Sequence, residues 1–156
     1  MISQSAEYAL RAVTFLAGRG RGAPATTRQI AAAAHVPEGY LSKVLQALAK
    51  AGLVSAQRGL NGGFVLCRPA HTLTLLDVVQ VVDPSRRITT CPLGIASHGV
   101  NLCALHRRLD NAAATVEDAL RDATIAQLLA GAGSTPLCDD HRECSRTPEL
   151  PKAGVA

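Results

Sequence analysis

The sequence predicts a mainly α-helical fold that carries one small β-hairpin. Its 156 residues are 47% hydrophobic but only 3% aromatic, so alanine and leucine must fill the core, which favours helices over a β-sandwich. Apolar residues recur at spacings of three and four along several segments. No apolar run approaches the roughly 18 residues that cross a bilayer, and the start lacks the pattern of a signal peptide. We therefore expect a soluble, cytoplasmic protein with no membrane partner.

The charges and the cysteines are unevenly distributed. Residues 1–80 carry eight basic and three acidic residues, a net charge of +5, whereas the remaining residues carry a net charge of −1. A basic front half suggests that this half meets a polyanion. The chain also has five cysteines. An odd number of cysteines in a reducing compartment favours metal binding or redox chemistry over a disulfide framework.

Three helices are expected in the front half. The first covers residues 5–17, where the apolar residues share one face. Thr26 and Gln29 have the spacing of a capping box that starts a short second helix. The third has Pro37 as its first helical residue and ends before Gly52, the expected left-handed stop. Its apolar positions have the spacing of a buried stripe: Leu41, Val44, Leu45 and Leu48.

Two short strands are expected directly after the third helix, over residues 53–56 and 64–66. Between them lies Asn61-Gly62, a strong hairpin signal. Two helices joined by a tight turn and followed at once by a hairpin form a winged helix-turn-helix. The hairpin tip also carries Arg58 and three glycines. Glycines let backbone amides approach phosphates or a minor groove, and the guanidinium supplies positive charge.

The exposed side of the third helix is the expected recognition surface, because the N-terminal residues of a recognition helix reach base edges in the major groove. Ser42 and Gln46 are candidate base readers, and Tyr40 and Lys43 are candidate phosphate or base contacts. The alternative is a solvated helix face without a ligand. The full set of candidate DNA contacts is Arg28, Glu38, Tyr40, Ser42, Lys43, Gln46, Arg58, Asn61, Gly62 and Gly63.

The back half predicts a short helix and then a long one. Thr74 and Asp77 offer a capping signal for the short helix, which ends at Asp83. The long helix has the three-and-four spacing of a heptad seam, which favours pairing with a second copy of the chain; packing within one chain is the alternative. Thr124 could break the run and cap a separate short helix. The seam positions are Leu102, Leu105, Leu109, Ala112, Val116, Ala119, Ala123 and Ala126.

A loop between these two helices has the composition of a metal site. Cys91, His98, Cys103 and His106 follow one another as Cys-x6-His-x4-Cys-x2-His. Four soft or borderline ligands within 16 residues, in a loop that leads into a helix, can bind a transition metal. A structural or solvent-exposed role is the alternative for each histidine.

The other three cysteines carry weaker signals. Cys67 follows an apolar strand and is expected to be a small buried hydrophobe. Cys138, His141 and Cys144 lie in a polar tail whose composition indicates disorder. Their spacing could capture a metal or an oxidant, but incidental cysteines explain it as well.

The residues of the winged segment are similar to those of a known family. The stretch YLSKVLQALAKAGLVSAQRGLNGGFVL (40–66), with AEYALRAVTFLA (6–17), closely resembles the IscR/NsrR-type family of bacterial regulators, and the wing sequence Arg58-Gly59-x-x-Gly62-Gly63-Phe64 is the most specific part. The resemblance covers about residues 1–130. It implies a homodimeric winged-helix transcription factor, usually a repressor, that binds an imperfect palindrome in double-stranded DNA.

The same resemblance implies an iron–sulfur cluster, with one departure. Cluster-binding relatives typically place three cysteines in the loop, and here Ser97 occupies the middle place. His98 or His106 could supply the missing ligand, which gives the mixed ligation known for two-iron clusters. In some relatives an acidic residue of the first helix reaches in from the other subunit, and Glu7 matches that position. A regulator without a cluster, which uses a cysteine thiol switch or a small ligand, is the alternative.

These inferences divide the chain into four parts. Residues 1–83 are the winged helix-turn-helix, 84–104 the sensor or cofactor loop, 105–131 the dimerisation helix and 132–156 a disordered tail. The chain has no phosphate-binding glycine loop, nucleophile elbow or paired-carboxylate motif. We therefore do not expect an enzyme.

Overall fold

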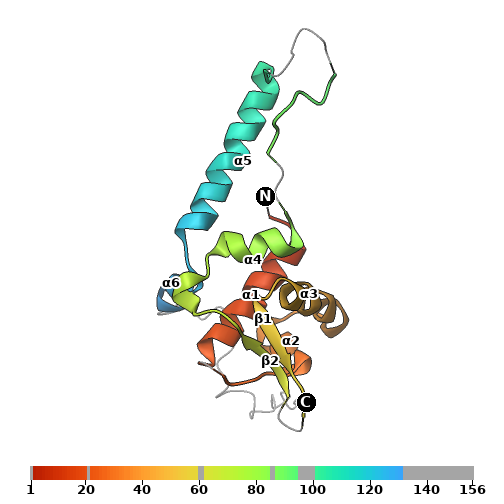
Figure 1. Ribbon diagram of the computed structural model, residues 1–156, viewed down its shortest axis with the longest axis vertical. Coiled ribbons are helices and arrows are strands. Elements are labelled where there is room, and N and C mark those ends of the chain that lie inside the picture. The colour runs from red at the N-terminus through yellow and green to blue at the C-terminus, as the bar shows by residue number, and fades with distance from the viewer. Residues whose placement is uncertain (1, 21, 60–61, 85–86, 95–100, 132–156) are drawn as a thin grey trace, which may run out of the picture.

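A body of short helices and a two-stranded hairpin supports one long helix that projects from it (Figure 1). The computed structural model describes residues 2–20, 22–59, 62–84, 87–94 and 101–131. The predicted fold class is confirmed. The elements in chain order are α1 (Gln4–Gly18), α2 (Thr27–Ala34), α3 (Glu38–Lys50), β1 (Val54–Gln57), β2 (Gly63–Leu66), the 3-10 turn η1 (Ala70–Thr72), α4 (Leu75–Val82), α5 (Ala104–Asp122) and α6 (Ile125–Gly131).

Helix α1 lies at the centre of the body and contacts α2, α3, α4 and α6. It begins at Ser3, whose hydroxyl accepts a hydrogen bond from the backbone N–H of Ala6. Its buried face is rich in alanine, so the neighbouring helices can approach closely. The fully buried positions are Ala6, Ala9, Ala12 and Val13.

The turn and stop residues of α2 and α3 follow the sequence signals. The Thr26–Gln29 capping box is present, and His35 takes the left-handed conformation at φ 51° to turn the chain. Helix α3 begins one residue later than expected, because Pro37 occupies its N-cap. At its other end Gly52 has φ 74°, and the N–H of Leu53 donates to the carbonyl of Leu48 at 3.0 Å. This hydrogen bond satisfies a carbonyl of the last turn of α3, and the left-handed Gly52 directs the chain toward β1.

The hairpin pairs β1 with β2 in antiparallel register, from Val54 opposite Leu66 to Gln57 opposite Gly63. Five residues therefore connect the strands, and Asn61 of the expected turn lies outside the described residues. The hairpin is also joined to the body, because Ala25 forms a β-bridge with Phe64. Its two hydrogen bonds are Phe64 N–H to Ala25 O at 2.7 Å and Ala25 N–H to Phe64 O at 3.1 Å.

This bridge leaves no room for a side chain at Gly63. A Cβ there would lie 2.5 Å from the carbonyl carbon and oxygen of Ala25, and the residue has φ 155°. A Cβ on Gly62 would lie 2.5 Å from the carbonyl oxygen of Gln57. Both glycines are therefore required by the packing of the wing itself.

The prediction that Cys67 is a small buried hydrophobe is wrong. Its side chain is exposed rather than buried. The strand pairing ends at Leu66, and the chain then turns away with the N–H of Cys67 bonded to the carbonyl of Leu53. The thiol therefore does not reach the core.

The segment expected as one helix over 105–131 consists of two helices, α5 and α6. Ala123 between them is extended, and its carbonyl accepts the N–H of Leu75 at 2.9 Å. The N–H of Ile125 donates to Leu73 O at 2.9 Å, and the Ile125 side chain is fully buried in the body. Thr124 caps α6 through Gln127, as the sequence allowed.

Helix α4 joins this arrangement as predicted: the Thr74–Asp77 capping box is present and the helix ends at Asp83. Within the ranges given above, no helix is long and apolar enough to cross a bilayer.

The close approach at the wing gives a first test. Gly63→Ala should lower the free energy of unfolding by about 1–3 kcal/mol, because its Cβ collides with backbone and its φ is unfavourable for alanine. Gly39→Ala is the matched control: it lies in α3, where a Cβ meets nothing within 4 Å, so alanine should stabilise the helix by roughly 0.5–1 kcal/mol. Urea titrations of both variants measure the difference. Equal stability of Gly63→Ala and wild type would contradict the bridge at Ala25.

Candidate nucleic-acid interface and cysteine–histidine centre

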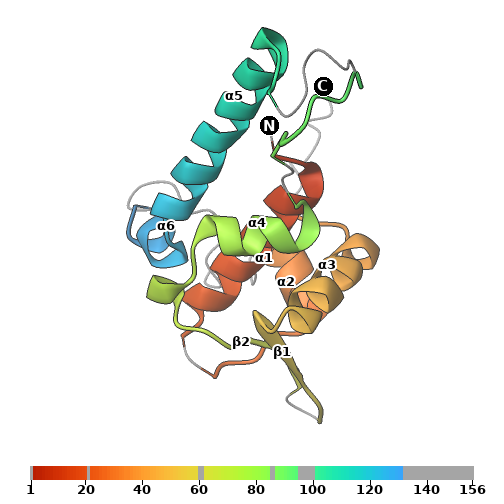
Figure 2. The same ribbon diagram turned by 45° about the horizontal axis from the view of Figure 1, so that its top comes forward.

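The predicted site residues lie in two regions of the molecule. The hairpin points away from one end of the body, and α5 projects from the other, as both views show (Figures 1 and 2). The candidate DNA contacts belong to the body, on the hairpin, on α2 and on α3, which lies along the side of the body. Cys91, Cys103 and His106 belong to the tip of α5.

Helix α3 presents a polar face because its opposite face is held in the core. Leu41, Val44, Leu45 and Leu48 are buried as predicted. Of the candidate contacts on this helix, four are exposed and Ser42 is half-buried. The exposed four are Glu38, Tyr40, Lys43 and Gln46.

Two of these candidates also have partners within the protein. The ring of Tyr40 meets that of Tyr8 edge to face, with centroids 5.6 Å apart, and its hydroxyl contacts the hydroxyl of Ser5. The hydroxyl of Ser42 donates to the carbonyl of Glu38 at 3.1 Å. Tyr40 therefore links the start of α3 to the start of α1.

Three of the candidate DNA contacts are basic. Arg28 on α2, Lys43 on α3 and Arg58 at the hairpin are all exposed. In the part of the chain that the structure describes, none of the three forms an ion pair. They are therefore available to an anionic partner.

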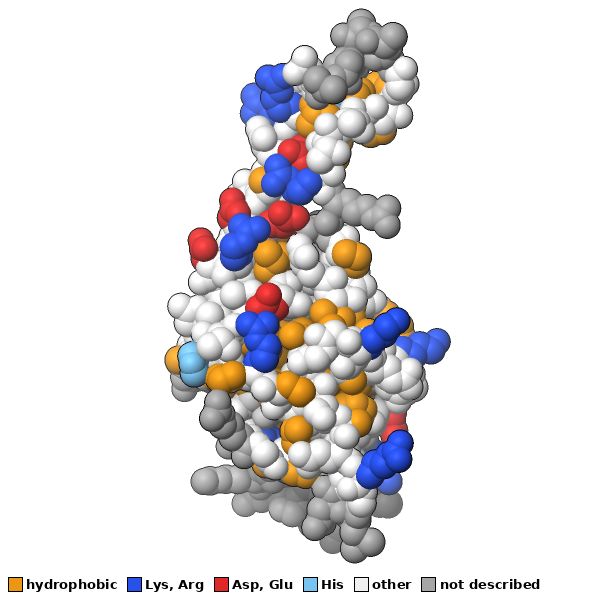
Figure 3. All heavy atoms as spheres, viewed as in Figure 1, with side chains coloured by type: hydrophobic (Ala, Val, Ile, Leu, Met, Phe, Trp, Pro, Cys, Tyr) orange, Lys and Arg blue, Asp and Glu red, His pale blue; other side chains and the backbone are white. Residues whose placement is uncertain are grey.

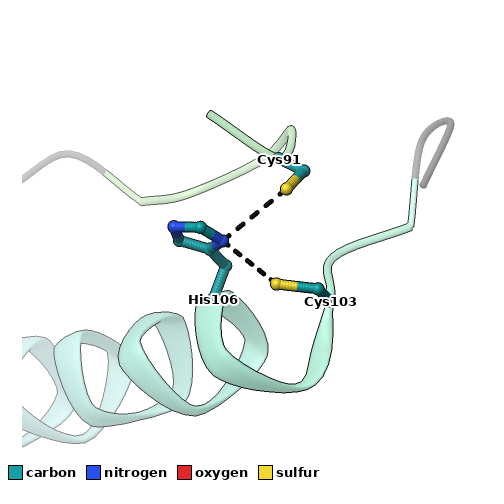
Figure 4. A group of neighbouring side chains, drawn as sticks. All are labelled: Cys91, Cys103 and His106. Carbon is teal, nitrogen blue, oxygen red and sulfur yellow. Dashed lines mark hydrogen bonds between the residues drawn. The ribbon is translucent and has the colours of Figure 1, made fainter. Parts of the chain in front are cut away.

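At the tip of α5 the structure brings together three of the predicted metal ligands, Cys91, Cys103 and His106 (Figure 4). The Nδ1 atom of His106 lies 3.1 Å from Sγ of Cys103 and 3.6 Å from Sγ of Cys91. All three donor atoms lie within 4.8 Å of one another. Two soft thiols and one imidazole are a donor set for a transition metal.

The local fold explains this convergence. Cys103 is the N-cap of α5 and His106 lies in the first turn, so both side chains meet at the helix start. The backbone N–H groups of this turn, that of His106 first, hold the pKa of the Cys103 thiol below its ordinary value. Cys91 comes from a separate segment that runs beside α5 (Figure 1).

The other predicted ligands are not part of this group. Glu7 lies on α1 and pairs with Arg11, one turn along the same helix. His98 and Ser97 lie outside the described residues, as do Cys138, His141 and Cys144 of the tail.

An ion pair that the sequence analysis did not find holds the Cys91 segment in place. Both carboxylate oxygens of Asp110 accept hydrogen bonds from Arg87, at 2.7 and 2.6 Å, and one also accepts the N–H of Ile88 at 2.9 Å. These bonds hold the pKa of Asp110 at about 2. Glu117, which is buried, lies 3.9 Å from the same guanidinium. Asp110 and Glu117 follow His106 by four and eleven residues, so helical spacing places all three on one face of α5, but it does not point to Arg87.

The predicted seam of α5 is largely uncovered in the single chain. Leu105, Leu109 and Val116 are 62%, 50% and 45% exposed. Leu109 and Val116 also line an apolar groove of about 510 Å³ between α4 and α5. Figure 3 shows hydrophobic side chains at the surface of both the body and the projecting arm.

Comparisons with known proteins agree with this architecture. Residues 2–131 match the model of the Rrf2 family, described as iron-dependent transcriptional regulators. Rv1287 of Mycobacterium tuberculosis, named as an HTH-type transcriptional regulator, is 31% identical over 145 residues, which is 90% of each chain. Protein aau3 of Rhizobium meliloti is 40% identical over 90 residues, and the match spans 58% of each protein.

Solved structures show the same fold. CymR, the global cysteine regulator of Bacillus subtilis, matches with a TM-score of 0.69 and 25% identity over 84% of this chain and 97% of its own. IscR of T. potens matches with a TM-score of 0.69 and 24% identity, over 85% of this chain and 88% of its own.

The Arg87–Asp110 pair predicts a pH dependence. The lowered pKa means that the stabilisation is complete above the unfolded value of roughly 4 and is lost as the pH falls toward about 2. Asp110→Asn should therefore lower the melting temperature most at pH 5–7, and the difference from wild type should shrink between pH 4 and 2. Asp118→Asn is the control, because that carboxylate pairs with Arg121 at an exposed position of the same helix and accepts no hydrogen bond from Arg87 in the described residues. Thermal melts by circular dichroism measure both, and a difference independent of pH would refute the assignment.

Proposed function

This chain belongs to the Rrf2 family of transcriptional regulators, and we propose that it is a homodimeric repressor whose operator affinity depends on the state of the Cys91–Cys103–His106 group. One observation carries the proposal: the body of the molecule is a winged helix with exposed basic residues, and a thiol–thiol–imidazole group lies at the tip of the projecting arm. The first can bind DNA and the second can respond to a metal or an oxidant.

The proposed DNA contacts divide by chemistry. Glu38, Tyr40, Ser42, Lys43 and Gln46 enter the major groove with α3, where Ser42 and Gln46 have the side chains suited to base edges and Tyr40 and Lys43 can reach phosphates at its border. On the wing and on α2 the contacts are to phosphates and the minor groove. They comprise Arg28, Arg58, Asn61, Gly62 and Gly63.

The proposed dimer uses the seam of α5. Leu105, Leu109 and Val116 form a continuous exposed apolar stripe, which a second copy of the helix would cover. Two heads held by one dimer bind half-sites at a fixed separation, so an imperfect palindrome is the matching operator. A change at the tip of α5 would alter how the two arms meet and therefore the separation of the heads.

The two thiols and the imidazole fit a metal that prefers thiolate ligands. The coordination of a bound metal would change when its ligands are oxidised or when the metal is lost. An iron–sulfur cluster is what the family resemblance implies, in a two-iron form with mixed Cys/His or Cys/carboxylate ligation; Glu7 would supply the carboxylate from the partner subunit. The described residues provide three donors around a single point, which does not by itself fit a cluster.

A cluster-free thiol switch is the second candidate. It is favoured by the closeness of the Cys91 and Cys103 sulfurs, which lie within 4.8 Å of each other. Loss of two hydrogens to an oxidant would join the sulfurs in a disulfide and tie the Cys91 segment to the start of α5.

DNA binding is tested with charge removals. Lys43→Ala and Arg58→Ala should each weaken binding to all duplexes and lower the slope of log affinity against log salt by about 1, because each removes one phosphate contact. Arg121→Ala on α5 removes the same charge far from the interface and should leave both unchanged. Fluorescence anisotropy with a duplex selected from a random pool measures affinity at several salt concentrations. Unaltered slopes for both head variants would overturn their assignment.

The dimer is tested on the seam. Leu109→Asp should shift the protein toward monomers, because a carboxylate would be buried against its counterpart in the partner subunit. Asn111→Asp adds the same charge on nearly the opposite side of α5, where the residue is exposed, and should remain dimeric. Light scattering after size-exclusion chromatography gives the masses. A dimeric Leu109→Asp variant would exclude this seam as the interface.

A further inference from the structure

We infer that the Cys91–Cys103–His106 group binds one tetrahedrally coordinated divalent ion of the zinc class per chain. The inference rests on the proposed function and specifies its effector: the availability of a divalent ion, rather than the state of an iron–sulfur cluster. It follows from the distances among the three donors and from how the chain holds them.

The donor spacing is that of ligands on a single ion. Zinc lies about 2.3 Å from a thiolate sulfur and about 2.0–2.1 Å from an imidazole nitrogen. At a tetrahedral angle these lengths place sulfur and nitrogen about 3.5 Å apart and two sulfurs about 3.8 Å apart. The observed distances from Nδ1 of His106 to the two sulfurs are 3.1 and 3.6 Å, and all three atoms lie within 4.8 Å of one another.

A two-iron cluster requires a different arrangement. Four terminal ligands divide between its two irons, and ligands of different irons lie farther apart than two ligands of one iron. Cys91, Cys103 and His106 instead converge on one point (Figure 4). Together they form one face of a tetrahedron, with the fourth position left for another donor.

The chemistry of the group suits an ion as well. Both sulfurs lie within hydrogen-bonding distance of the same nitrogen, so the three donor atoms already face one another. A divalent ion binds cysteine as the thiolate, so its binding releases the thiol protons to solvent. Thiolate and imidazole together are ligands that select zinc among the divalent ions common in cells.

The chain holds the three donors before any ion arrives. Cys103 and His106 are fixed by the first turn of α5. Cys91 is held by the hydrogen bonds of Arg87 and Ile88 to Asp110, one turn further along the same helix than His106. A bound ion would therefore join the Cys91 segment to α5 in addition to the contacts of this segment with Asp110 and Glu117, and its removal would loosen this link.

The test is a metal titration of the full chain, purified without oxygen and stripped of metal. Cobalt(II) should bind at one ion per chain, with the intense visible bands of tetrahedral cobalt and a thiolate-to-cobalt charge-transfer band, and zinc should displace it. Cys91→Ser, Cys103→Ser and His106→Ala should each weaken binding by at least about 100-fold, since even outer-shell changes cost 10–100-fold. Cys67→Ser removes an exposed thiol of the body and should bind as wild type does.

Three results would overturn the inference: two irons and two sulfides per chain after anaerobic reconstitution, weak octahedral cobalt bands, or cobalt binding that His106→Ala leaves unchanged. Operator affinity measured with zinc and after its removal by a chelator separates this inference from the proposed function. If the ion binds as described but operator affinity is unchanged, regulation through this group fails while the metal site stands. If a cluster forms and alters operator affinity, the regulator stands and the single-ion site fails.

Discussion

Two backbone hydrogen bonds between the ends of α4 and α5 determine how the projecting arm sits on the body. Leu75 donates to Ala123 and Ile125 donates to Leu73, so a short extended segment replaces the helix at this point. The buried Ile125 side chain then anchors α6 beside α1. In the proposed dimer, a displacement of the arm at this base would therefore change the position of the wing and of α3 relative to the partner subunit.

The tip of the arm depends on a second set of contacts. The described residues 87–94, which include Cys91, form a turn but no helix or strand, and their position comes from the bonds that Arg87 and Ile88 form with Asp110. The centre and this anchor share one face of α5. A change in the ligation of Cys91 therefore acts on the helix whose seam, in the proposed dimer, meets the partner subunit.

Local signals predicted much of the fold, and long-range contacts account for what they missed. The capping boxes at Thr26 and Thr74 and the glycine stop at Gly52 act within one turn of helix, so the sequence alone located those helices. The heptad spacing of the apolar residues continues past Ala123, although α5 ends at Asp122. The helix ends there because the backbone at Thr124 forms a β-bridge with Thr74, and apolar periodicity carries no signal of such a long-range contact. Cysteine and histidine spacing identified three donors that the structure brings together. Arg87 and Asp110 are 23 residues apart, and no local pattern connects them.

The glycines of the wing have a role in the fold that is independent of the proposed DNA contacts. Gly62 and Gly63 are needed because backbone atoms of the same chain crowd them, whatever duplex the wing meets. Proteins could therefore share this wing sequence and still recognise unrelated operators, provided that the outward side chains of α3 differ. An attempt to change the preferred operator should accordingly leave the wing glycines intact and vary α3, where substitutions at exposed positions cost the fold little.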